Sequence, residues 1–254
     1  MRAMRFLPSA PEGLFGGGDL GPPPVSPVAV AEIFYSVQGE GMLVGVPSAF
    51  VRLSGCNLRC TWCDTPYASW EPEGTELMLG ALLSEARREW PTHVVVTGGE
   101  PMIAPSIVLL TERLRDHFKH ITIETAGTVY APVTCDLMSI SPKLANSTPH
   151  ERDGGRWAAQ HDRLRYRPEV LKQLMSEYEY QLKFVVSAPE DLPEIKKILE
   201  ETNADRSRVV LMAEGTSTET ISERAAWIVE LCKQEHFRYS PRLHIDLWGN
   251  KRGT

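Results

Sequence analysis

The strongest constraint on the fold is a regular alternation of short apolar segments with longer amphipathic ones. Residues 93–96 form a largely β-branched run, which is typical of a strand buried on both faces. The preceding segment, 76–90, places its apolar residues on one helical face. Repeated along the chain, this order predicts a parallel sheet with crossover helices.

The alternation gives specific boundaries. The expected strands are 28–35, 48–53, 93–96, 121–124, 137–141, 181–186 and 209–212, and the expected helices are 76–90, 106–118, 168–178, 187–202 and 218–234. About six core strands are too few to close an eight-stranded barrel. The predicted fold class is therefore α/β, a partial TIM-type barrel of about six parallel strands with outer helices and a ligand site at its C-terminal mouth.

Two segments differ from the rest of the expected core domain, 28–254. Residues 1–27 contain G-G-G and P-P-P and are expected to form a flexible arm. Residues 146–167 are polar and rich in turn formers, and we expect a partly helical excursion from the core. It could cover the site, join a dimer interface or be a solvated surface segment, and the sequence leaves these three open.

Composition limits the kind of protein. A hydrophobic content of 42% and a charged content of 24% are ordinary, and the net charge of -6 argues against general nucleic-acid binding. No apolar run approaches the roughly 20 residues of a membrane span, and the first residues lack the apolar core of a signal peptide. We therefore expect a cytoplasmic protein with no nucleic-acid or membrane partner.

Three of the five cysteines, Cys56, Cys60 and Cys63, fall within eight positions. Zinc sites usually recruit two separated ligand pairs, and a thioredoxin-like site needs only two cysteines. Three thiolates suit a four-iron cluster in which the fourth iron has no protein ligand and can bind another molecule. Cys135 and Cys232 are expected to be small buried hydrophobes, because an odd, clustered set is unlike a disulfide framework.

Polar groups at strand ends supply further candidates. The sequences T-G-G-E-P (97–101) and S-P-K (141–143) follow buried strands, at the rim where α/β folds bind ligands. Q-G-E-G (38–41) combines glycines, which allow close backbone approach, with two polar side chains. Arg52 lies in an apolar strand and needs an anionic partner, which is either a structural ion pair or a bound carboxylate.

The C-x3-C-x2-C spacing, with an aromatic residue before the last cysteine, resembles the radical S-adenosylmethionine superfamily. The segments E-I-F-Y-S-V-Q-G-E-G, F-V-R-L-S-G-C-N-L-R-C and C-D-T, followed by Y-Q-L-K-F-V-V and the tail L-H-I-D-L-W-G-N-K-R-G, resemble the 7-carboxy-7-deazaguanine synthase family from about residue 31 to the end. The resemblance implies a lyase that converts 6-carboxy-5,6,7,8-tetrahydropterin to 7-carboxy-7-deazaguanine and ammonia, on the route to queuosine and other 7-deazapurines.

The resemblance also implies site residues. The cysteines would hold a 4Fe-4S cluster, and Thr65 would contact Mg²⁺ with substrate oxygens completing the shell. The residues implied for S-adenosyl-L-methionine are Gly99, Glu100, Ser141, Pro142, Lys143, Met212, Ala213, Glu214 and Gly215. The residues implied for the pterin are Val37, Gln38, Gly39, Glu40, Arg52, Thr97, Glu124 and His244. Arg52 would pair with the pterin carboxylate in bidentate fashion, and no acid or base is assigned.

The family pattern has one departure and two alternatives. Many members read E-T-N-G where this chain has E-T-A-G (124–127), so Ala126 lacks the asparagine's hydrogen bonds. The family further implies a flavodoxin or ferredoxin as electron donor and a homodimer. The alternatives are a radical SAM activase that makes a glycyl radical on a partner protein, and a non-catalytic iron–sulfur or zinc protein.

Overall fold

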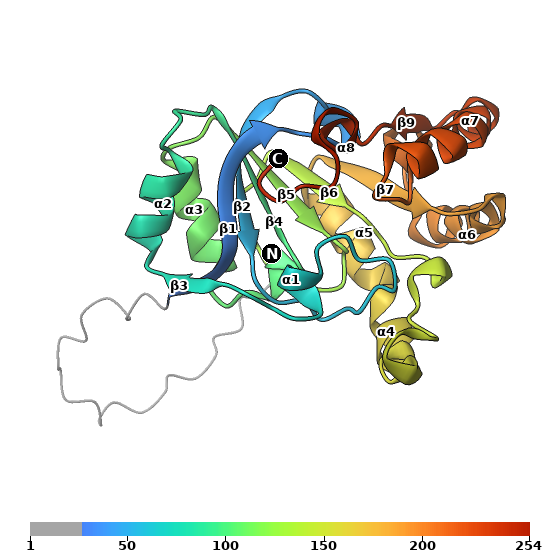
Figure 1. Ribbon diagram of the computed structural model, residues 1–254, viewed down its shortest axis with the longest axis horizontal. Helices are drawn as coiled ribbons and strands as arrows, with labels where there is room; N and C mark the ends of the chain where they lie inside the picture. Colours follow the sequence, from blue (N-terminus) through green and yellow to red (C-terminus); the bar gives the residue numbers. More distant parts are fainter. Residues whose placement is uncertain (1–26) are drawn as a thin grey trace, which may run out of the picture.

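A mixed nine-stranded sheet organises the protein, whose computed structural model describes residues 27–254 (Figure 1). The strand order is β3-β1-β2-β4-β5-β6-β7-β8-β9. The strands are β1 (Val28–Val37), β2 (Pro47–Leu53), β3 (Thr75–Leu77), β4 (His93–Gly98), β5 (His120–Thr125), β6 (Leu137–Ile140), β7 (Tyr180–Val186), β8 (Val209–Ala213) and β9 (Arg238–Ser240). The expected N-terminal arm falls almost wholly on residues 1–26, outside the described part.

Most of the sheet is parallel. In the order in which the strands lie in the sheet, β2, β4, β5, β6, β7, β8 and β9 each pair in parallel with the next. At one edge, β1 pairs antiparallel with both β2 and β3. Every residue of β7 and β8 is buried, as expected for strands that are covered on both faces. The α/β prediction is therefore confirmed, and the edges β3 and β9 stand at opposite ends of an open strand order.

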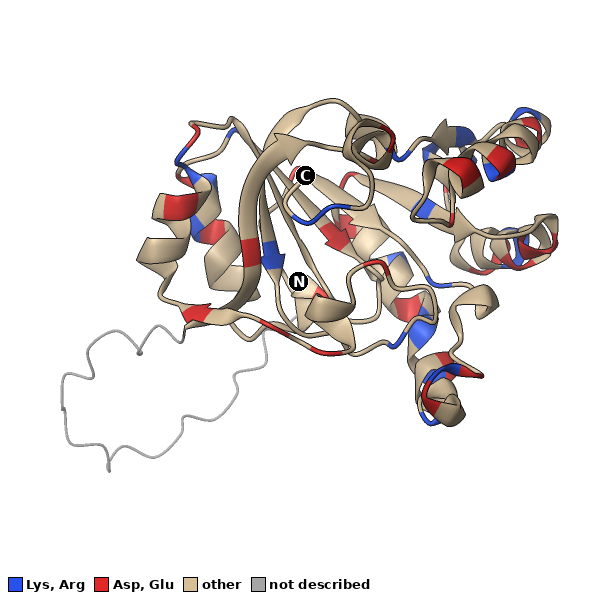
Figure 2. Ribbon diagram, viewed as in Figure 1, with Lys and Arg blue, Asp and Glu red and all other residues tan. Residues whose placement is uncertain are grey.

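Helices connect the strands and cover the sheet. They are α1 (Pro66–Ser69), α2 (Leu79–Ala86), α3 (Ile107–Arg115), α4 (Ala158–Arg165), α5 (Pro168–Glu177), α6 (Leu192–Thr202), α7 (Thr218–Glu235) and α8 (Leu243–Trp248). Figure 1 shows α2 and α3 beside one end of the sheet and α6 and α7 beside the other. In Figure 2 acidic and basic residues are interspersed on α6 and α7, whose buried positions are mostly apolar. None of the helices within residues 27–254 is long and apolar enough to cross a membrane.

Three predicted details are corrected. The sheet has seven parallel strands rather than about six, because the three-residue β9 extends it. The expected helix 76–90 is shorter, because Leu77 pairs with Val28 in β3 and the helix runs only from Leu79 to Ala86. Trp90, the last residue of the expected helix, lies beyond it with a positive φ of 53° and is 81% exposed.

Residues 146–167 contain the predicted helical part. The segment includes a 3-10 turn at Arg152–Gly155 and helix α4, and a further turn at Ala145–Ser147 begins it. It returns to the core through α5, whose first residue is Pro168, a residue favoured at the first turn of a helix.

Candidate active site

A cavity of about 700 Å³ lies at the C-terminal ends of the parallel strands. Its floor includes the last residues of β4 and β5 and inward-facing positions of β6, β7 and β8, and residues 250–254 of the tail form part of its wall. This is the rim where parallel α/β sheets bind ligands. The volume is in the usual range of small-molecule and cofactor sites.

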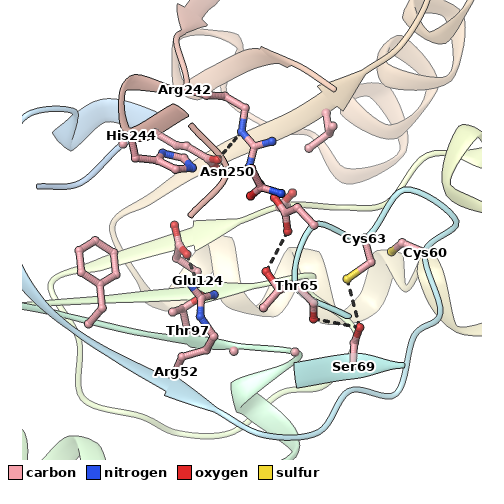
Figure 3. A pocket seen from close by; sticks show the side chains of 18 of the residues that line it. Arg52, Cys60, Cys63, Thr65, Ser69, Thr97, Glu124, Arg242, His244 and Asn250 are labelled. Atoms are coloured by element: carbon pink, nitrogen blue, oxygen red, sulfur yellow. Dashed lines mark hydrogen bonds and ion pairs between the residues drawn. The ribbon is translucent and has the colours of Figure 1, made fainter. Parts of the chain in front are cut away.

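The cysteine loop, residues 56–63, forms one side of this cavity. Cys56, Cys60 and Cys63 are free thiols and all line it. Burial raises the pKa of Cys56 and Cys60 to about 12. Figure 3 shows Cys63 next to Cys60 and joined to Ser69, whose hydroxyl lies 3.1 Å from the Cys63 Sγ.

Two glycines stand at the end of β4, where Gly98 is the last residue of the strand and Gly99 follows it. A Cβ on Gly99 would lie 2.3 Å from the carbonyl oxygen of Gly55 and 2.6 Å from the Cβ of Cys56. Only glycine allows β4 to pack this closely against the cysteine loop. The G-G-E-P sequence therefore positions the loop as well as the rim.

The donor set suits a multi-iron cluster. Three free thiols that line one cavity fit a four-iron cluster, because each thiolate can bind a different iron. Leu58, Cys60 and Ala126 form a small apolar cluster there, with Trp62 packed against it.

Opposite charges cross the cavity in a connected network. Glu40 accepts from Lys183 and, at 2.9 Å, from the Arg242 Nε, and Arg242 also contacts Asp64. Burial alone would raise the pKa of Glu40, but the Lys183 and Arg242 cations hold it well below its usual value. The Lys183 Nζ lies 3.8 Å from Glu124. Glu40 and Lys183 are therefore both ionised.

Thr97 and Glu124 meet on the floor of the site. The Thr97 hydroxyl donates to Glu124 Oε2 at 2.8 Å, from neighbouring strands β4 and β5. Two sets of residues that were predicted to bind the pterin, Val37–Glu40 and His244, are also brought together, since a Cβ on Gly39 would lie 1.9 Å from the His244 Nδ1. Burial lowers the pKa of His244, so its ring is neutral at pH 7.

Arg52 has the structural ion pair that the sequence left as one alternative. Its Nε donates to Glu32 Oε1 at 2.7 Å, across the β1–β2 pairing. Its terminal nitrogens make no hydrogen bond within the described residues, and the side chain lines the cavity. Figure 3 shows the Arg52 guanidinium pointing toward Thr97 and Glu124.

Most predicted site residues line the one cavity. The lining ones are Cys56, Cys60, Cys63, Thr65, Val37, Gln38, Gly39, Glu40, Arg52, Thr97, Glu124, His244, Gly99, Ser141, Lys143 and Met212. Those that lie outside the lining are Glu100, Pro142, Ala213, Glu214 and Gly215.

Glu100 lies behind the cavity wall. Its carboxylate accepts from the backbone N–H groups of Met102 and Ala126 and from the Thr125 hydroxyl, and the residue is 1% exposed. Burial raises its pKa. The side chain ties the end of β4 to the end of β5. The Glu100–Ala126 bond uses the backbone N–H of residue 126, so it does not depend on the side chain at this position.

Sequence reasoning missed several lining residues. They include Asp64, Ser139, Lys183, Thr216, Arg242 and Asn250. Lys183 carried the same signal as Arg52, a charge within an apolar strand, and that argument would have found it. Arg242 had no local signal, because its partners Glu40 and Asp64 are about 200 and 178 residues away in sequence.

Comparison with known proteins agrees with this geometry. The sequence profile of the Radical SAM superfamily matches residues 50–165. The curated 7-carboxy-7-deazaguanine synthases of Rhodopirellula baltica and Halobacterium salinarum are 44% and 43% identical to the chain, covering 90% and 89% of it and 90% and 92% of themselves. The crystal structure of QueE from Escherichia coli aligns with a TM-score of 0.64 at 26% identity, over 86% of this chain and 95% of that one.

The mostly parallel sheet, the cavity lined by three cysteines and the profile match together define a radical SAM protein. The full-length relatives then identify the group within that class. The chain belongs to the 7-carboxy-7-deazaguanine synthase family.

Proposed function

We propose that this protein converts 6-carboxy-5,6,7,8-tetrahydropterin to 7-carboxy-7-deazaguanine with release of ammonia, as a lyase of 7-deazapurine (queuosine) biosynthesis. One observation carries the proposal: three free thiols and the Arg52 guanidinium face the same cavity. A cluster and a carboxylated bicyclic substrate would therefore share one cavity. Family membership supports the same reaction over an activase or an inert metal protein.

The cysteines Cys56, Cys60 and Cys63 would hold the 4Fe-4S cluster. Together with S-adenosyl-L-methionine, the bound cluster supplies the radical chemistry that removes an unactivated hydrogen. The chain contributes binding and orientation. Lys143 donates to the carbonyl and hydroxyl oxygens of Ser141 at 2.9 and 2.8 Å, which holds its ammonium at the rim.

S-adenosyl-L-methionine would contact residues on both sides of that rim. Gly99, Ser141, Lys143 and Met212 would meet it directly, because they line the cavity. The other predicted residues do not line the cavity, and they would contribute indirectly by fixing the ends of the strands. They are Glu100, Pro142 and residues 213–215. The Gly215 carbonyl, for example, accepts from the buried Arg242.

The pterin would be recognised by ionised groups. Glu40 is anionic because of its two cationic partners, and a carboxylate accepts hydrogen bonds from the amino and ring N–H groups of a pterin. Arg52 would bind the substrate carboxylate through its terminal nitrogens, while Glu32 fixes the plane of its guanidinium. Thr97 and Glu124 would complete the pocket floor.

Magnesium would bind beside Thr65. The Thr65 hydroxyl donates to Asp64 Oδ1 at 2.9 Å, which leaves its lone pairs free for a cation. One hydroxyl is a weak site alone, so substrate oxygens and water would provide the remaining ligands.

The proposal also includes a partial-barrel curvature of the sheet, a homodimer, and a flavodoxin or ferredoxin as electron donor.

The test is turnover by the anaerobically reconstituted protein. The assay contains 6-carboxy-5,6,7,8-tetrahydropterin, S-adenosyl-L-methionine, magnesium and a strong reductant. Formation of 7-carboxy-7-deazaguanine is the expected result. Cleavage of S-adenosyl-L-methionine with intact pterin would overturn the substrate assignment, and a cluster-loaded protein inert toward S-adenosyl-L-methionine would overturn the reaction class.

A further inference from the structure

The segment from Leu144 to α4 holds the cysteine loop from outside the cavity. The Thr61 N–H donates to the Ser147 carbonyl at 2.8 Å, and the Arg59 N–H donates to the His161 Nδ1 at 3.1 Å. These two amides flank Cys60 on either side. The excursion that the sequence left without a role is therefore hydrogen-bonded to the loop.

The His161 ring has a partner at each nitrogen. It lies on α4, is 1% exposed, and its Nε2 lies 2.9 Å from the Ser147 Oγ. The Ser147 hydroxyl donates its proton to the Leu144 carbonyl at 2.6 Å, so it accepts from the ring. Nε2 therefore carries the ring proton, and Nδ1 keeps the lone pair that accepts from Arg59.

This arrangement requires a neutral imidazole of one tautomer. A protonated ring would place an N–H against the Arg59 N–H. Burial lowers the pKa of His161 to about 4, in agreement with the neutral form at pH 7. No other side chain or carbonyl among the described residues accepts from the Arg59 amide.

We propose that His161 is a positioning residue, which fixes the backbone on one side of Cys60 and so orients the thiol toward the cluster. The inference rests on the proposed role of the three cysteines as cluster ligands. The chain's own contribution is a rigid acceptor. No atom of the loop itself accepts from the Arg59 amide, and a buried amide without an acceptor is costly.

Three variants test this role. His161→Leu removes the acceptor, whereas His161→Asn keeps an oxygen at the position of Nδ1, because both atoms are bonded to Cγ. Ile228→Ala is the control, since Ile228 is fully buried on α7, away from the loop. Each protein is reconstituted anaerobically, and bound iron, the rate of iron loss to a chelator and amide hydrogen exchange in 57–62 are measured.

We expect His161→Leu to lose iron about tenfold faster than the parent protein, with faster exchange in 57–62, because one backbone hydrogen bond is lost. His161→Asn should recover most of both properties, and Ile228→Ala should lower the melting temperature without changing either. Parent-like iron retention in His161→Leu would overturn the proposal. Equal loss in His161→Leu and His161→Asn would also overturn it, because the acceptor would then have no role.

Failure of the proposed role of the three cysteines as cluster ligands gives a different result. In that case the parent protein binds no iron, and the His161 comparison is read from hydrogen exchange of the metal-free chain. Slow exchange at 57–62 in the parent and in His161→Asn, with fast exchange in His161→Leu, supports the positioning role. The same rate in all three overturns it.

Discussion

At the scale of single residues, Arg52 shows how one guanidinium can have two partners. Its Nε is committed to Glu32 on the neighbouring strand, and its terminal nitrogens face the cavity. The ion pair holds the guanidinium in one orientation, so less side-chain entropy would be lost in the proposed binding of a carboxylate. The structural ion pair and the carboxylate receptor, which are alternatives in the sequence, are compatible in the structure.

Replacing Arg52 by alanine should raise the KM for 6-carboxy-5,6,7,8-tetrahydropterin roughly a hundredfold, because two hydrogen bonds to a charged group are lost. The ultraviolet–visible spectrum of the cluster should stay unchanged. Steady-state kinetics with the Arg115→Ala variant is the control, since Arg115 pairs with Asp136 at the other end of the strands. A KM equal to that of the parent would show that Arg52 does not bind substrate.

The cysteines allow a matched comparison of the same substitution at two sites. Cys60→Ala should lower the iron bound after reconstitution to near zero and abolish cleavage of S-adenosyl-L-methionine, because only two thiolates remain. Cys232→Ala should retain both properties, since Cys232 is buried on α7 outside the cavity. Full iron content in Cys60→Ala would contradict the ligand assignment.

At the scale of elements, the hydrophobic pattern of the sequence was sufficient to predict a helix or strand wherever that element buries a whole face. Strands β7 and β8 and helix α7 lie within one residue of their predicted bounds, and α6 ends at its predicted residue but begins at Leu192 rather than 187. The short strands β3 and β9 were missed, because three residues cannot display a period and their existence depends on the neighbouring strand. The role of 146–167 was also invisible, since it depends on backbone hydrogen bonds to a distant loop.

Helix α4 should make stability depend on pH through His161. The pKa of its ring is about 4 when folded and about 6.5 when unfolded, so the unfolded chain binds more protons between these values. The free energy of unfolding therefore falls as the pH decreases from 6.5 toward 4. Between pH 7 and 4.5 this residue should account for about 2 kcal/mol of the decrease.

Urea unfolding of the metal-free parent and of His161→Asn at both pH values measures this contribution. The decrease should be smaller in the variant, which has no titrating group at position 161. His120 and His244 also have lowered pKa values and act in the same direction in both proteins, so they cancel in the comparison. Equal decreases in the two proteins would refute the assignment.

At the scale of the whole molecule, one buried arginine joins three distant parts of the chain. Arg242, just before α8, contacts Glu40 after β1, Asp64 after the cysteine loop, and the Gly215 carbonyl after β8. The sequence located the separate motifs because each follows a strand. The sequence could not show that these motifs share the Arg242 cation, because this contact forms only when the C-terminal tail packs over the ends of the strands.

Replacing Arg242 by leucine should lower the free energy of unfolding by about 3 kcal/mol, because breaking a buried ion pair leaves charges without a partner. Glu40 keeps Lys183, and the Asp64 side chain is 38% exposed, so the loss should be at the lower end of the usual range. Urea unfolding at pH 7 measures it, with the exposed Arg238→Leu on β9 as the control. A second substitution, Asp64→Asn, should recover part of the loss in Arg242→Leu but destabilise the parent. Additive effects of the two substitutions would mean that Arg242 does not couple the tail to the cysteine loop.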